Sequence, residues 1–445
     1  MRQRIGAAVD ATAAFFGASV AGIALLLPIA FSWTAAGTPT HVAGLVASVP
    51  RGATIGMVVA VTVAVLICSF ARPATGWLVA FAGALGILVN HSAGRAATSA
   101  DLLITQNYVD SVCAGVALGA LGAAVLRTSL PALGFALGAG GVVAVGDLAD
   151  VLGIPGQDPW AVLETPPRWL IAAAVPLLLI AAIRHRGRAT SDEGDSGATT
   201  TIDLPITPIL ASLVLGLVIL AASEWLSRQY SHVSAPGDNR LDIAIAVAAT
   251  VVAAFVAAML LPGRDGAGVL LAVALTAAAD ALGAAPRPTW SLFAVIVLVA
   301  LGLYAGLKAP APFAALVLIA GLCVLASTLT NQGDKTFVAG TAALALTVGY
   351  SCGAARPRYG PSGVLALGAL YLPSVVTALP VDGAVWPPRD NTADPATPGR
   401  VALIVTGCCA LALLILYRMR PRPRTSGKAT DPGVGGDVRN TRSWP

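Results

Sequence analysis

Charge is scarce in this sequence, and this scarcity decides its class. Asp, Glu, Lys and Arg together make up 11% of the 445 residues, whereas soluble domains carry about 25%. The net charge of +5 is not gathered into a basic stripe with interleaved aromatic residues, which is the pattern that nucleic-acid binding requires. We therefore exclude a soluble domain and expect no nucleic-acid partner.

Signatures of catalysis and of cofactor or metal binding are also scarce. The sequence contains no HExxH and no Walker A segment, the patterns that mark zinc hydrolases and nucleotide hydrolysis. The histidines are scattered and have no metal-ligand spacing; they are His41, His91, His185 and His232. We accordingly expect no enzyme activity, no cofactor and no metal site.

Long apolar runs are what the sequence has in place of charge. Hydrophobic residues make up 56% of the chain, and the mean hydropathy is +0.80. A bilayer core of about 30 Å needs roughly 20 helical residues, and helices satisfy their own backbone groups in lipid. The sequence predicts an all-α, polytopic transmembrane helix bundle of about fourteen spans. The predicted spans are 11–31, 53–71, 74–92, 110–127, 129–148, 168–184, 206–226, 241–262, 267–283, 289–308, 310–329, 336–355, 361–380 and 400–417.

The distribution of arginine and lysine predicts the orientation. If the N-terminus lies in the cytoplasm, the short turns on that side carry the basic residues, as in "LRTSLP" and "LPGRDG". This bias is the known determinant of topology, so we expect both termini in the cytoplasm of a cell with the protein in its inner (plasma) membrane. All six cysteines fall inside predicted spans, and no disulfide framework is expected.

A polar segment divides the spans into six and eight. We predict a six-helix membrane half over 1–184, a disordered cytoplasmic linker over 185–205 and an eight-helix half over 206–417. The tail, 418–445, is polar and basic, and we expect it to be disordered in the cytoplasm.

Three aspartates stand out near the predicted outer ends of the spans. Asp147 and Asp150 share a helix face through their i, i+3 spacing, and Asp280 lies in the outer third of its span. A charge at the bilayer centre costs about 2.5–3.5 kcal/mol on insertion scales. Two explanations stay open: hydrated helix ends, or an external vestibule that binds a cation, a proton or sugar hydroxyls. Asn90 and Tyr350 are further candidates for a substrate or ion path.

Small residues and prolines shape several spans. Pro28, Pro176 and Pro373 fall inside predicted helices and should kink them. GxxxG pairs allow two helices to approach closely; they occur at Gly115/Gly119, Gly134/Gly138, Gly302/Gly306 and Gly349/Gly353.

In its helix count and its break after the sixth span, the chain resembles fourteen-span secondary carriers. These include the major facilitator type and the flippases that export lipid-linked sugars. The turn "FARPATGW" keeps one arginine of the G-x-x-x-D-R-x-G-R-[KR] motif that major facilitator proteins carry between spans two and three. The opening, "RQRIGAAVDATAAFFGASVAGIALLLP", is similar to multi-pass membrane proteins of actinobacteria, from which no residue roles can be transferred.

The resemblance implies a secondary transporter or flippase that handles lipid-linked or cell-envelope glycans. Its partners would then be membrane lipids and a lipid-linked glycan substrate, and the two halves would rock about a central polar path. Two alternatives stay open. One is a non-catalytic scaffold that partners an envelope-biosynthesis protein. The other is an integral-membrane transferase, against which the acid-free predicted loop 32–52 argues.

Overall fold

The protein is an all-helical bundle in the computed structural model, which describes residues 2–26, 39–71, 73–93, 100–146, 165–189, 205–232, 240–283, 291–328, 334–379 and 396–420. These residues contain fourteen α-helices, two short 3-10 helices and no strand. The α-helices are α1 (Arg2–Leu26), α2 (Pro39–Phe70), α3 (Pro73–Ala93), α4 (Ala100–Val125), α5 (Ser129–Val145), α7 (Arg168–Ala189), α8 (Thr207–His232), α9 (Arg240–Leu260), α10 (Ala267–Leu282), α11 (Ser291–Lys308), α12 (Pro312–Thr328), α13 (Asp334–Ala355), α14 (Gly360–Gly368) and α15 (Thr397–Met419). The 3-10 helices are η3 (Ala369–Tyr371) and η4 (Val375–Ala378).

Every predicted span contains one of these helices, so the predicted fold class is confirmed. Among the described residues, eleven helical segments are long and apolar enough to cross a membrane, and α5, α10 and α12 are shorter apolar helices. The protein is therefore a multi-pass membrane protein. We call "outer" the end of the bundle where α3 ends and α4 begins, which the orientation prediction places outside the cell.

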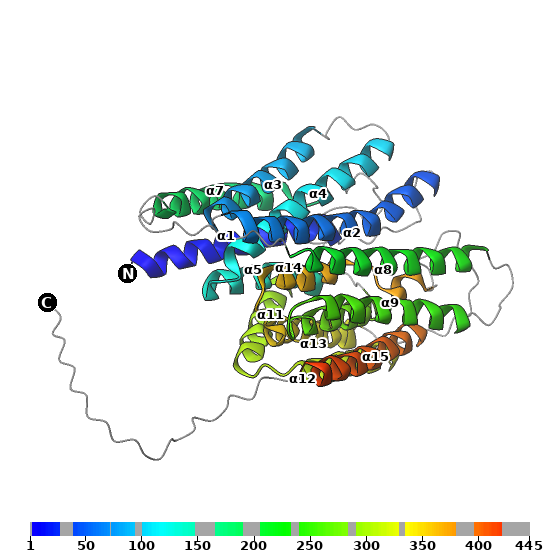
Figure 1. The fold of residues 1–445 in the computed structure, drawn as a ribbon. Coiled ribbons are helices and arrows are strands. Elements are labelled where there is room, and N and C mark those ends of the chain that lie inside the picture. Colours follow the sequence, from blue (N-terminus) through cyan, green and yellow to red (C-terminus); the bar gives the residue numbers. More distant parts are fainter. Residues whose placement is uncertain are drawn as a thin grey trace, which may run out of the picture.

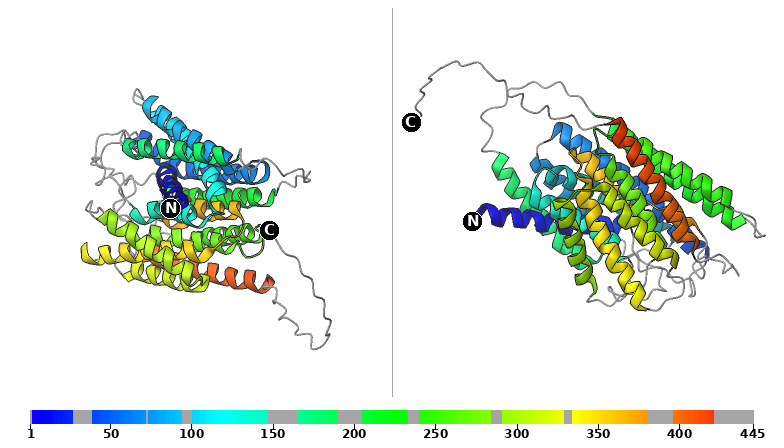
Figure 2. Two further views of the ribbon diagram at one scale, coloured as in Figure 1. Left: turned by 90° about the vertical axis from the view of Figure 1, so that its left-hand side faces the viewer. Right: turned by 90° about the horizontal axis from the view of Figure 1, so that it is seen from below.

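The helices form two groups with two central elements between them (Figures 1 and 2). In the first group α2 packs on α4, α1 on α5 and α4, and α7 on α3. In the second group α8 packs on α9, α11 on α13, and α15 on α10 and α12. α14 contacts α2 and α4 on one side and α10 on the other, while α5 packs on α11 and α13. Contacts thus cross the predicted division at 185–205, which stays a prediction.

Two helices begin earlier than predicted. α2 begins at Pro39, so most of the predicted external loop 32–52 is helical. α4 begins at Ala100, ten residues before the predicted span 110–127. The loop prediction was wrong at both places because it relied on polarity. The polar residues at these helix starts pair with one another across the interface between α2, α3 and α4, as described below.

The opposite, predicted inner, end of the first group is held by a buried carboxylate. The Asp10 side chain is 6% exposed, and its oxygens lie 2.8 Å from Nη1 of Arg184 and 3.2 Å from Nε2 of His185. The His185 ring stacks on Trp77, with 5.6 Å between ring centroids. These contacts join α1, α3 and α7. α7 continues beyond these contacts to Ala189, inside the segment predicted as a disordered linker.

Candidate functional site

The span that begins with α14, between the two groups, is not a continuous helix. α14 ends at Gly368, η3 covers Ala369–Tyr371, and η4 resumes at Val375 after an extended link. Pro373 has no backbone N–H and disfavours a helical conformation in the residue before it. Leu372 accordingly has φ −71° and ψ 144°. The proline predicted to kink this span therefore breaks it.

The ends of this broken span are capped by aspartates from α10 and the turn before it. At its inner end the Asp265 carboxylate accepts N–H bonds from Arg358 and Tyr359 at 2.9–3.1 Å. At the break the Asp280 carboxylate accepts the N–H of Ser374 at 3.3 Å. The Ser374 hydroxyl also bonds this carboxylate and accepts the N–H of Val376 at 3.1 Å. Negative charge at a helix N-terminus is favourable, so the freed backbone groups stabilise Asp280.

The break lies in the middle of the protein. Residues 361–372 are all buried, because α14 lies between the two groups of helices (Figure 1). Tyr371 connects the break to the first group, because its hydroxyl donates to the carbonyl of Ala139 in α5 at 2.9 Å. A break that touches both groups is placed where a relative movement of the groups would change its surroundings.

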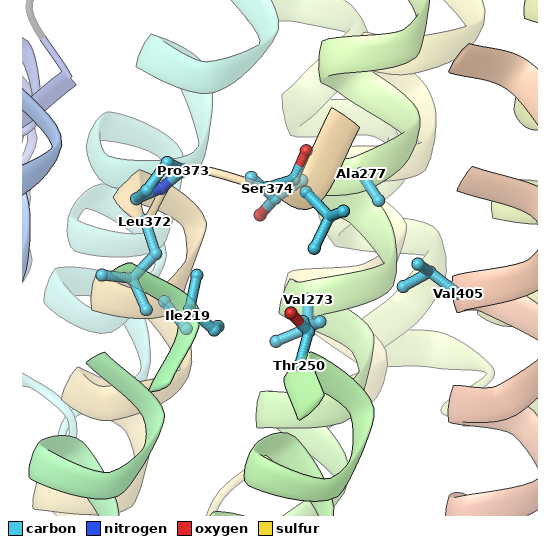
Figure 3. A pocket seen from close by; sticks show the side chains of 11 residues that line it. Ile219, Thr250, Val273, Ala277, Leu372, Pro373, Ser374 and Val405 are labelled. Atoms are coloured by element: carbon cyan, nitrogen blue, oxygen red, sulfur yellow. The ribbon is translucent and has the colours of Figure 1, made fainter. Parts of the chain in front are cut away.

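A small pocket lies beside the break, with a cavity volume of about 10 Å³. Side chains from α8, α9 and α10 face the broken span across it, as Figure 3 shows for Ile219, Thr250 and Val273. The full lining comprises Ile219, Thr250, Val273, Thr276, Ala277, Ala369, Leu372, Pro373, Ser374, Val375 and Val405. It is mostly apolar with a few hydroxyl groups, which is the usual composition of a small-molecule site.

One of these hydroxyls is free to bind a ligand. Thr250 is the middle residue of α9 and is 3% exposed, and its Oγ1 has no hydrogen-bond partner. The neighbouring Thr276 hydroxyl already donates to the carbonyl of Ala272 at 2.8 Å. An unsatisfied buried hydroxyl costs about 1–3 kcal/mol, and a ligand that bonds Thr250 would remove this cost.

The predicted site residues lie in separate places. Asp280 is at the break, whereas Asp147 and Asp150 lie outside the described residues. Asn90 contacts α4, where its Nδ2 donates to Oδ1 of Asp110 at 2.9 Å. The Tyr350 hydroxyl donates to the carbonyl of Ala309 at the end of α11, at 2.9 Å. The structure thus does not bring Asn90, Tyr350 and Asp280 together, and a path through them stays a prediction.

One serine, Ser351, lies in a sequence pattern that hydrolases also carry. Gly349–Gly353 reads G-x-S-x-G, the pattern of the nucleophile elbow of α/β hydrolases. Here these residues lie inside the helix α13, and both glycines pack against α11: a Cβ on Gly349 would lie 2.0 Å from the carbonyl oxygen of Val299. A nucleophile elbow requires a sharp strand-to-helix turn, so the motif here serves helix packing.

Sequence reasoning missed three residues of the site. Thr250 and Ser374 are ordinary residues in apolar spans, and only the fold places them at the break. Asp265 lies in the turn "LPGRDG", which was used only to predict orientation. Nothing in the sequence around Asp265 indicates that its carboxylate caps the start of α14, about ninety residues later.

No protein-family model matches the chain, and no curated protein matches its sequence. Among solved structures, the chain is similar to an auto-inhibited POT family peptide transporter, with a TM-score of 0.45, 12% identity and coverage of 94% of this chain and 96% of that chain. It is also similar to FucP, a major facilitator superfamily transporter in the outward conformation (TM-score 0.36, 14% identity, 94% and 99% covered). A third is the nucleoside transporter NupG (TM-score 0.34, 11% identity, 93% and 98% covered). These TM-scores are too low to establish a shared fold, so what this chain does has to follow from its own residues.

Proposed function

We propose that the protein is a secondary transporter whose substrate binds at the broken span. The observation that carries this proposal is the break at Leu372–Ser374, buried between two groups of helices, beside a carboxylate and a pocket. Non-helical backbone at membrane depth is tolerated where it is buried in protein or lines a cavity. Discontinuous helices of this kind form the substrate sites of many transporters.

The chemistry of the pocket indicates a small solute. In this closed arrangement the cavity of about 10 Å³ has room for about one water molecule, so a solute would enter only when the two groups of helices separate. The lining would hold an apolar body, while Thr250 supplies a hydroxyl for a polar group. Asp280 is not part of the lining, but its carboxylate holds the lining residue Ser374. A lipid-linked or cell-envelope glycan, the cargo expected from the resemblance, would need the two groups to separate further.

An ion pair between the two groups supports a closed outer face. Nε of Arg51 in α2 lies 2.6 Å from Oε1 of Glu224 in α8. We call this pair the outer latch. A transporter that alternates its access must break such a contact to open the pocket outward.

Thiol accessibility at the pocket tests the proposal without a known substrate. Ala277→Cys places a thiol in the pocket, and Val252→Cys on α9, at a valine that is 61% exposed, is the matched lipid-facing control. In proteoliposomes, a membrane-impermeant maleimide should label Ala277→Cys when added on either side, with peptide mass spectrometry separating it from the native cysteines. Absence of labelling from both sides would exclude alternating access.

The scaffold alternative is favoured by a different observation, the close approach of helix backbones at glycines. A Cβ on Gly302 would lie 2.1 Å from the carbonyl oxygen of Leu346, and one on Gly119 would lie 2.1 Å from that of Ala60. Such close backbone contact stabilises static helix pairs. If Ala277→Cys is inert, purification in mild detergent should instead yield a stoichiometric envelope-biosynthesis partner.

A further inference from the structure

A second polar cluster lies in the first group of helices, and the proposed substrate site does not use it. Nε2 of His91 in α3 lies 2.9 Å from Oδ2 of Asp110 in α4. The Asn90 amide donates to the other oxygen of Asp110 at 2.9 Å and to the carbonyl of Gln106 at 3.0 Å. The carboxylate is therefore held from two sides by neighbours on α3.

This cluster is buried. The side chains of His91 and Asp110 are 1% and 8% exposed. Gln106, one helical turn before Asp110, is 6% exposed, and both polar atoms of its side chain lack a hydrogen-bond partner. Buried polar groups are normally paired. An unpaired amide beside a buried carboxylate marks a place where the polar network can rearrange.

The His91–Asp110 pair has a simple electrostatic reason to take up a proton. With a neutral imidazole and an ionised carboxylate, the pair carries one buried negative charge. One added proton, bonded to the imidazole or the carboxylate, makes the pair neutral overall. Burial favours the state with the smaller net charge. Histidine exchanges its proton near neutral pH when it is unperturbed.

Other titratable groups surround the cluster at greater exposure. α4 contributes Asp101, Tyr108 and Cys113, α2 contributes Arg51, α7 contributes Arg168, and α8 contributes Glu224 and Arg228. Asp101 is exposed, and the Arg51 and Glu224 side chains, 44% and 28% exposed, neutralise each other in the outer latch. Among these neighbouring groups, none is as buried as the His91–Asp110 pair, so an unbalanced charge costs most on this pair.

The cluster is connected to the outer latch through α2. Asn107, next to Gln106, donates to Oγ of Ser48 in α2 at 3.0 Å. α2 and α4 touch closely here, because a Cβ on Gly52 would lie 2.5 Å from Oγ of Ser111. Arg51 of the latch also hydrogen-bonds Tyr108 of α4. A shift of α4 would therefore be passed to the pair that joins α2 to α8.

We propose that His91 and Asp110 form a proton-binding site whose occupancy controls the outer latch. Proton uptake changes the net charge next to Asn90 and Gln106, the network on α4 rearranges, and α2 moves relative to α8. The proton is thus the ligand of a second site in the first group of helices, separate from the pocket at the broken span.

Histidine-selective ¹³C labelling and NMR of the full-length protein in micelles test proton binding. The His91 signal, assigned with His91→Gln, should shift as the pH is lowered. Asp110→Asn removes the opposite charge and should weaken proton affinity about tenfold or more, whereas Asn90→Leu should strengthen it. Asp101→Asn, an exposed carboxylate on the same helix, is the matched control and should change nothing.

A distance measurement in the same protein tests the link to the latch. Spin labels carried by an unnatural amino acid at Ala47 in α2 and Ser227 in α8, both exposed, leave the native cysteines in place. The label-to-label distance distribution should change with pH in the wild type and in Asp101→Asn, and should be pH-independent in Asp110→Asn.

Three outcomes would overturn the proposal: a His91 signal that does not titrate, a midpoint unchanged in both Asp110→Asn and Asn90→Leu, or a latch distance that ignores pH. Asn90→Leu keeps the test informative if Asp110→Asn does not fold. None of these outcomes affects thiol labelling of Ala277→Cys, so failure here is distinguishable from failure of the proposed substrate site.

Discussion

The two regions with buried aspartates satisfy their charge in different ways. Asp110 is held by side chains, those of His91 and Asn90 on a neighbouring helix. Asp280 is held by Ser374, through a backbone N–H at a helix break that follows a proline and through its hydroxyl. The first arrangement depends on two continuous helices packed together, and the second depends on one helix being interrupted.

This difference teaches what each region can do. A network of side chains can lose or gain a proton and rearrange, because the amide of Gln106, one turn from Asp110, is unpaired. A carboxylate fixed by backbone groups has a static environment, but the interruption that supplies those groups also makes room for a ligand. We therefore assign the proton to the region around Asp110 and the solute to the region around Asp280.

The largest expected effect comes from removing one partner of the side-chain network. Asp110→Leu leaves the buried imidazole of His91 without the carboxylate beside it, and breaking a buried pair in this way costs about 3 kcal/mol or more. SDS-induced unfolding in mixed micelles should show this loss. The double variant His91→Leu/Asp110→Leu should regain most of it, since replacing both partners with apolar residues is often neutral.

The exposed Asp101 provides the control, and Asp101→Leu should change the free energy of unfolding by no more than about 0.5 kcal/mol. If the double variant were as unstable as Asp110→Leu, the loss of stability would come from the changed volume at position 110 and not from breaking the His91–Asp110 pair.

The sequence predicted the continuous helices better than the polar contacts between them. Every apolar run except 361–380 became a single α-helix, because lipid forces a run of that length to satisfy its own backbone. The start of α4 was missed because Gln106 and Asn107 look like a loop until their contacts with α3 and α2 are known. Asp110, the first residue of the predicted span, was not nominated as a functional residue, although its neighbour in space, Asn90, was.

The broken span was predicted in part. Pro373 was expected to kink its helix, and Asp280 was nominated from its position near the end of a span. That these two features meet could not be read from the sequence, because residues 280 and 373 come together only through the packing of α10 on η3 and η4. Thr250 joined the site for the same reason.

A smaller effect is expected at the break. Asp280→Asn keeps an oxygen that can accept the N–H of Ser374 but loses the charge, and a charged hydrogen bond exceeds a neutral one by about 1 kcal/mol. The free energy of unfolding should therefore fall by about 1 kcal/mol, less than for Asp110→Leu. Ala277→Cys labelling should change more than stability does, because Ser374, which Asp280 holds, lines the pocket.

Ser374→Ala provides the comparison, since it keeps the backbone N–H that Asp280 accepts but removes the hydroxyl that bonds Asp280 and caps η4. Loss of such a cap costs about 1 kcal/mol. If Asp280→Asn were as destabilising as Asp110→Leu, the distinction between backbone and side-chain stabilisation of the two aspartates would be wrong.

The smallest effect is expected at Tyr350, whose hydroxyl contacts only the end of the neighbouring helix α11. Tyr350→Phe removes one hydrogen bond to the carbonyl of Ala309 at the end of α11, which is worth about 0.5 kcal/mol where water can replace the donor. Labelling of Ala277→Cys and the pH response of the outer latch should both stay at wild-type levels. A change in either would place Tyr350 on the path after all, because a residue that only anchors the end of α11 has no contact through which to alter the pocket at η4 or the pair on α4.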